Sequence, residues 1–85
     1  MKKQFIKKLE NQMDPIVMYF TKAEVVFDMV IDAYDIQERE TDLWVIESGH
    51  FNAEINMKKG SISYNEEEDS YIFELDDLSI EFVFA

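Results

Sequence analysis

The clearest pattern in the chain surrounds Gly49-His50. Residues 43–48 and 51–57 both suit β structure, and only these two residues separate them. A two-residue loop of this kind predicts a tight hairpin, because Gly49 can adopt the positive φ that such turns require. The second run alternates apolar and polar residues, and its apolar face consists of Phe51, Ala53, Ile55 and Met57. That alternation is typical of a strand with one buried and one solvated face.

Further short strands are predicted after this hairpin. Residues 62–64, 70–76 and 78–84 alternate in the same way, and acidic turns separate them at 66–69 and 76–77. The last run is the most regular, with Leu78, Ile80, Phe82 and Phe84 on one side. Strands at such short spacing, joined by turns, predict an antiparallel meander.

A short helix is predicted over residues 2–12. Phe5, Ile6 and Leu9 share one face, and lysines occupy much of the remainder. The helix should end by Met13, because Pro15 disfavours helical dihedrals in the residue before it. A helix of this length is marginal in water, so we expect it to pack on the sheet.

Residues 16–36 allow two interpretations. A capping box at Thr21–Glu24 would begin a helix over 21–36. Alternatively, Thr21–Glu24 is a turn that joins strands 16–20 and 25–34. The second interpretation is favoured by the many strand-forming residues and by an apolar face at period two, which consists of Val25, Phe27, Met29, Ile31 and Ala33. Residues 37–42 are expected to form a polar loop.

Together these elements predict one domain, residues 1–85, of the α+β class. The N-terminal helix would pack on an antiparallel meander of about five or six strands. With 47% hydrophobic residues and 14% aromatic residues, the chain is too apolar to be intrinsically disordered.

The net charge affects the functional interpretation most. The net charge is −11, from 19 acidic and eight basic residues. Binding of nucleic acid or of an anionic membrane through the body of the domain is not expected, because phosphate binding needs lysine and arginine. No apolar run approaches the roughly 20 residues that span a bilayer, and no signal-peptide pattern follows the basic start. Together with the absence of cysteine, this predicts a cytoplasmic location.

Catalytic and cofactor motifs are not found in the sequence. The single histidine, His50, falls in the predicted turn, where a solvated side chain is expected. With two glycines, the chain has no glycine-rich phosphate loop, so we expect neither an enzyme nor a bound cofactor. The acidic turns offer oxygen atoms for calcium or magnesium, but consecutive acids lack the alternate spacing of a calcium loop, so no metal site is expected.

The first functional hypothesis is a small module that presents carboxylates to a basic protein. Such a surface could imitate nucleic acid and inhibit a DNA- or RNA-binding enzyme, as small acidic phage and mobile-element proteins do. The predicted partner-binding residues are Asp28, Asp32, Glu66, Glu67, Glu68, Asp69, Asp76 and Asp77.

The alternative hypothesis is a structural or adaptor subunit, or a homodimer, that associates through apolar surface. It depends on whether Leu78–Phe84 lies at a sheet edge, where unpaired backbone groups would accept another strand, or in the centre. The sequence leaves both positions open.

Overall fold

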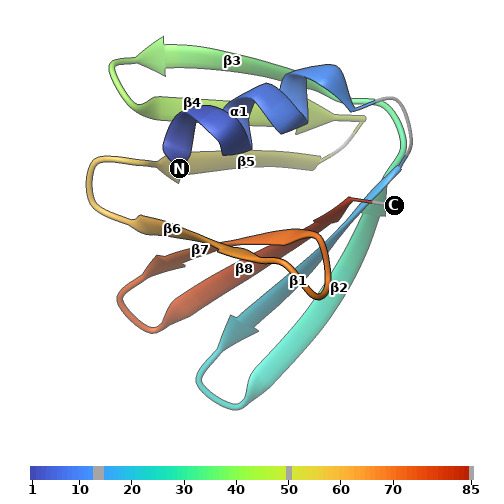
Figure 1. Cartoon of the computed structure of the whole chain (residues 1–85), viewed down its shortest axis with the longest axis vertical. Helices are drawn as coiled ribbons and strands as arrows, with labels where there is room; N and C mark the ends of the chain where they lie inside the picture. The colour runs from blue at the N-terminus through green and yellow to red at the C-terminus, as the bar shows by residue number, and fades with distance from the viewer. Residues whose placement is uncertain (13–14, 50, 85) are drawn as a thin grey trace.

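The computed structural model describes residues 1–12, 15–49 and 51–84. It contains one helix and eight strands (Figure 1). In chain order these are α1 (Lys2–Asn11), β1 (Ile16–Lys22), β2 (Val25–Ile31), β3 (Asp35–Glu40), β4 (Leu43–Ser48), β5 (Phe51–Asn56), β6 (Ser61–Asn65), β7 (Ser70–Leu75) and β8 (Leu78–Phe84). The helix and the strands of the C-terminal half lie where the sequence predicts them.

The strands form two antiparallel sheets. One has five strands in the order β2-β1-β8-β7-β6, and the other has the three strands β3-β4-β5. The α+β class is therefore confirmed, whereas the predicted count of five or six strands is too low. The prediction of one meander is also wrong, because β5 and β6 belong to different sheets and β8 pairs with β1. Figure 1 shows the two sheets as separate layers, with α1 crossing in front of β4 and β5.

The prediction of a polar loop at residues 37–42 is wrong. Asp35–Glu40 is strand β3, which pairs with β4 and reaches Leu43 after a turn at Thr41 and Asp42. Its side chains are exposed except for half-buried Ile36, so the strand lacks the apolar alternation that would reveal it. Pairing with the strongly β-forming strand β4 overrides this polar composition.

Residues 16–31 form a hairpin, so the helical interpretation of 21–36 is wrong. All seven residues of β1 pair with all seven of β2, from Ile16 with Ile31 to Lys22 with Val25. The turn is shorter than predicted and consists of Ala23 and Glu24. Ala23 has a φ of 53°, in the left-handed region that tight hairpin turns need. The second strand also ends earlier than expected, at Ile31.

Strand β8 lies in the centre of the five-stranded sheet. It pairs with β1 on one side, from Ile16 with Phe84 to Lys22 with Leu78, and with β7 on the other. The suggestion that Leu78–Phe84 forms an edge is therefore wrong. The edges of this sheet are β2 and β6.

One core joins the helix to both sheets. Phe5 and Leu9 of α1 are almost fully buried, and the Phe5 ring lies 4.8 Å from the ring of Phe82 in β8. At the other end of the helix, the Tyr34 hydroxyl donates a hydrogen bond to the Leu9 carbonyl at 2.6 Å. Partial burial raises the pKa of Tyr34. Within the described residues, no helix has the length and hydropathy needed to cross a membrane.

Candidate functional site

Most carboxylates of the protein are directed to solvent without an internal counter-ion. Of the 19 acidic side chains, 18 belong to the described residues, since Asp14 does not. Within that set the ion pairs are Lys8–Asp69 and Arg39–Glu54. Both are exposed pairs, each worth about 0–1 kcal/mol in stability. Internal pairing therefore leaves most of the negative charge available to a partner or to counter-ions.

The eight carboxylates predicted to bind a partner are all exposed, and the structure separates them into three groups. The turn at 66–69 and the turn at 76–77 lie at opposite ends of β7. A strand of that length spans about 20 Å, so the two turns do not form one patch. Asp28 lies in the middle of β2, opposite Tyr19 of β1.

Asp32 follows the end of β2. It lies at the same end of the sheet as the turn at 66–69, because Ile31 pairs with Ile16, Ile16 pairs with Phe84, and the neighbouring Val83 pairs with Ser70. Two strands, β1 and β8, nevertheless separate β2 from the β6–β7 hairpin. Asp28 and Asp32 thus belong to the β2 edge of the sheet.

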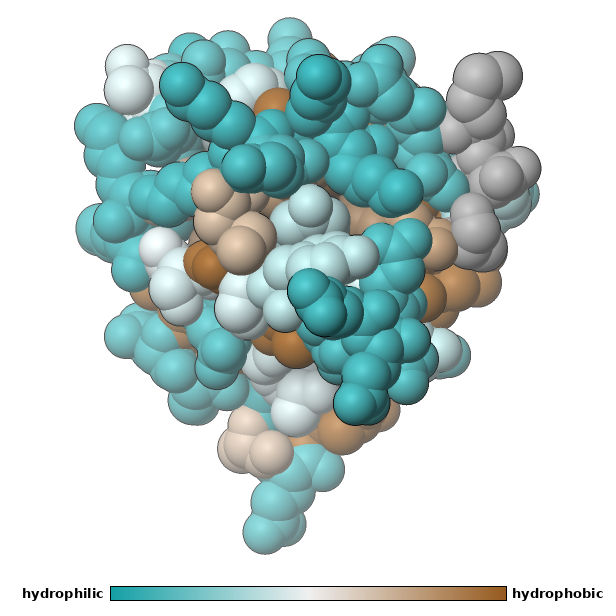
Figure 2. Space-filling model, in the orientation of Figure 1, coloured by the Kyte–Doolittle hydropathy of each residue, from teal (hydrophilic) through white to brown (hydrophobic). Residues whose placement is uncertain are grey.

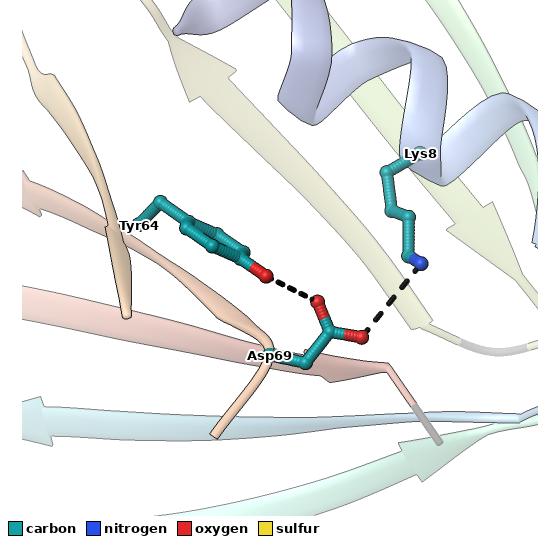
Figure 3. A network of polar contacts seen from close by, with 3 residues as sticks. All are labelled: Lys8, Tyr64 and Asp69. Carbon is teal, nitrogen blue, oxygen red and sulfur yellow. Dashed lines mark hydrogen bonds and ion pairs between the residues drawn. The ribbon is translucent and has the colours of Figure 1, made fainter. Parts of the chain in front are cut away.

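One predicted partner-binding residue has an internal role. Asp69 accepts a hydrogen bond from the Tyr64 hydroxyl at 2.7 Å through Oδ1, and its Oδ2 lies 3.8 Å from Lys8 Nζ (Figure 3). These contacts join the β6–β7 hairpin to α1. The hydrogen bond to Asp69 is also the main reason why the pKa of Tyr64 is raised above 10.0. Asp69 also has a positive backbone φ of 49°, which aspartate adopts more readily than most residues, so it suits this turn position.

The apolar edge of β2 was not predicted from the sequence. Four of its seven side chains are more than half exposed: Val25 64%, Val26 64%, Phe27 55% and Val30 61%. Figure 2 shows hydrophobic atoms along the lower right margin of the molecule, where β2 runs in Figure 1. Alternate residues of a strand point to opposite faces, so Val25 and Phe27 lie on one face and Val26 and Val30 on the other.

The available signal was the run Val25-Val26-Phe27, which is apolar at consecutive positions. A half-buried strand with one wet face has polar residues at every second position. A run without that alternation indicates a strand covered on both faces, but in the structure these three side chains are each more than half exposed.

Two hollows lie beside α1 in the described surface. The larger, about 490 Å³, lies between the end of α1 and the β2–β3 connection, and its carboxylates belong to Glu10, Asp32 and Asp35. The smaller, about 340 Å³, lies beside α1 and contains Trp44. No group of three or more potential metal ligands occurs among the described residues. The predicted solvated position of His50 falls outside the described residues.

Comparison with known proteins yields no match to a family model, a curated protein or a solved structure.

Proposed function

We propose that this protein is a small acidic module that binds a basic protein. The observation that carries the proposal is the abundance of exposed carboxylates without an internal ion pair, in a chain with a net charge of −11. Complementary charge accelerates association and suppresses wrong partners, so binding would be fast and steeply dependent on salt. The module acts by binding and has no catalytic role.

The favoured partner class is a nucleic-acid-binding enzyme, which has a basic surface suited to phosphates. The protein would occupy that surface and inhibit the enzyme, as phage-type nucleic-acid mimics do in the cytoplasm. The three acidic groups then contribute at different contact points, since they lie at the two ends of the five-stranded sheet and along β2. Asp69 contributes least, because Lys8 and Tyr64 already contact it.

A second candidate function is supported by the apolar edge of β2. Exposed strand edges that carry apolar side chains accept other strands, so a structural or adaptor subunit, or a homo-oligomer, is the alternative. Association of this kind would survive high salt, because apolar contact is not screened.

The first proposal is tested by affinity capture of the tagged protein from its host lysate, with elution in a salt gradient. A variant with Glu66→Gln, Glu67→Gln and Glu68→Gln is compared with a control of equal charge, Glu40→Gln, Glu47→Gln and Glu74→Gln. All six carboxylates are exposed. We expect a basic protein that moderate salt releases, that duplex DNA competes off, and that the first variant retains less well than the control.

Two results contradict the proposal. Partners that hold through high salt and bind both variants equally would favour the adaptor. An eluate that contains only the protein itself would favour a homo-oligomer.

A further inference from the structure

Strand β2 differs from every other sheet edge in the described structure. Proteins protect sheet edges with charged residues, proline, bulges or short strands. The other edges follow this rule: β3 reads DIQERE and has a register shift, β5 reads FNAEIN, and β6 is the five-residue strand SISYN. Strand β2 reads VVFDMVI, pairs with β1 without a shift, and has one polar residue, Asp28, whereas β5 and β6 each have at least three.

The free edge of β2 is suited to backbone pairing. In an antiparallel ladder, the N–H and C=O groups of every second residue point away from the paired strand. On β2 these groups point away from β1, to a side where no strand of the sheet follows. Large apolar side chains flank that edge on both faces, so an added strand would bury Val25 and Phe27 on one side and Val26 and Val30 on the other.

A second copy of the chain fits this edge less well than a basic strand does. In the register that pairs all seven residues of β2 with the β2 of a second copy, each Asp28 lies opposite the other Asp28. Like charges directly opposite across two strands destabilise the pair. The net charge of −11 on each copy adds to this repulsion.

The charge pattern instead specifies a basic strand. On one face of β2, Asp28 lies between Val26 and Val30, and the alternation continues with Glu24 in the preceding turn and Asp32 just after the strand. The order is symmetric about Asp28, so the complementary strand has basic, apolar, basic, apolar and basic residues at every second position, in either direction. Such a strand would place opposite charges and apolar pairs across the new ladder.

We infer that the edge of β2 takes up an extended segment of a basic protein partner, with alternating basic and apolar residues, as a sixth strand of the sheet. This inference rests on the proposed function and specifies how that partner is held: opposite charges supply the salt-sensitive attraction, and backbone pairing with apolar burial fixes the position of the segment.

The test uses the whole protein and a nine-residue peptide, KTVTKTVTK, acetylated and amidated at its ends. A control peptide, KKKTTTTVV, has the same composition without the alternation. Binding is followed by NMR on ¹⁵N-labelled protein. We expect the alternating peptide to shift the amides of β2 and slow their exchange with solvent, and to bind at least about tenfold more tightly than the control.

Two variants separate a site on β2 from general attraction. Asp28→Lys and Glu74→Lys make the same change in net charge at exposed strand positions, one on β2 and one on β7. Asp28→Lys should weaken binding of the alternating peptide at least about tenfold, because it places like charges opposite each other. Glu74→Lys should weaken it by less than about threefold, through net charge alone.

Several results would overturn the inference. In the peptide experiment these are equal binding of both peptides, equal loss of affinity in both variants, amide shifts centred on residues 66–69 or 76–77, and no binding of the alternating peptide at millimolar concentration. A dimer of the free protein that pairs through β2 would also overturn it. The lysate capture tests the two proposals separately. If Asp28→Lys retains a salt-sensitive basic partner as well as the wild type does, the proposed function stands and this inference fails.

Discussion

Phe20 and Phe27 lie opposite each other on β1 and β2, with ring centroids 4.8 Å apart and ring planes within 7° of parallel. Phe20 also contacts Phe51 of the second sheet edge-on, at 6.3 Å between centroids. The exposed residue Phe27 is thereby connected to the core through half-buried Phe20. This aromatic contact orients the hairpin that carries the proposed binding edge.

Phe27→Ala should therefore lower the free energy of unfolding by about 1 kcal/mol, because it removes the stacked pair. Val26→Ala is the control: Val26 is 64% exposed on the opposite face, and its loss should change the free energy of unfolding by about 0.5 kcal/mol or less. Urea denaturation measures both. Equal effects would show that the stack adds no stability.

The two glycines should respond differently to asparagine. At Gly60 an added Cβ would lie 2.2 Å from Phe73 Cε1 in the core, whereas at Gly49 it would meet nothing within 4 Å. Gly49 has a φ of 54°, which asparagine adopts more readily than alanine. We expect Gly60→Ala and Gly60→Asn to cost about 1–3 kcal/mol or more, and Gly49→Asn to cost less than Gly49→Ala. Thermal unfolding of the four variants measures these differences. A small loss of stability at Gly60 would contradict the packing against Phe73.

The Tyr64–Asp69 hydrogen bond should affect how the free energy of unfolding changes at alkaline pH. Because the pKa of Tyr64 is raised in the folded protein, its contribution is complete below the ordinary tyrosine value and is lost as the pH rises through the folded value. Tyr64→Phe should therefore lose less stability than the wild type as the pH rises above about 10.

Asp69→Gly tests the cause directly, since glycine keeps the positive φ of this turn position. The pKa of Tyr64 should fall towards 10.0, while the pKa of Tyr34, which is raised by burial, should stay in place. NMR of ¹³C-labelled tyrosine rings follows each group separately. A Tyr64 pKa that does not move would exclude Asp69 as its cause.

Stability should also rise with salt. The carboxylates repel one another, and screening shortens the reach of that repulsion from about 10 Å at 0.1 M to about 3 Å at 1 M salt. Glu66→Gln with Glu67→Gln and Glu68→Gln should be more stable than the wild type at low salt, by about 0.5 kcal/mol. The difference should shrink at high salt in urea denaturation. An unchanged difference would point to backbone effects in the turn.

Local sequence patterns predicted the strands that have one buried and one solvated face. The alternation around Ile55 and the glycine at position 49 predicted the central hairpin, and the structure confirms both strands and the positive φ. The same reasoning held for β8, where Ile80, Phe82 and Phe84 are buried.

Strand β3 could not be predicted in this way, because it has almost no apolar face and depends on pairing with β4. The neighbours of β8 are also a long-range property. Ile16 pairs with Phe84 across nearly the whole chain, and no local pattern encodes that pairing. Without it, the central position of β8 and the edge position of β2 could not be derived.

The candidate site was predicted in its residue types but not in its arrangement. The acidic turns and Asp28 are exposed as expected. Their division among the two sheet ends and β2 follows from strand order, which the sequence left open. The apolar residues of β2 looked like core residues because propensity and hydrophobicity do not report which side of a sheet is covered.

The central claim is that β2 is the surface that retains a basic partner. Hydrogen–deuterium exchange of the captured complex, compared with the free protein, tests it most directly. We predict that exchange slows in residues 25–31 and stays unchanged in the other edge of the same sheet, residues 61–65. Slowed exchange confined to residues 66–69 and 76–77, with residues 25–31 exchanging as in the free protein, would contradict the claim.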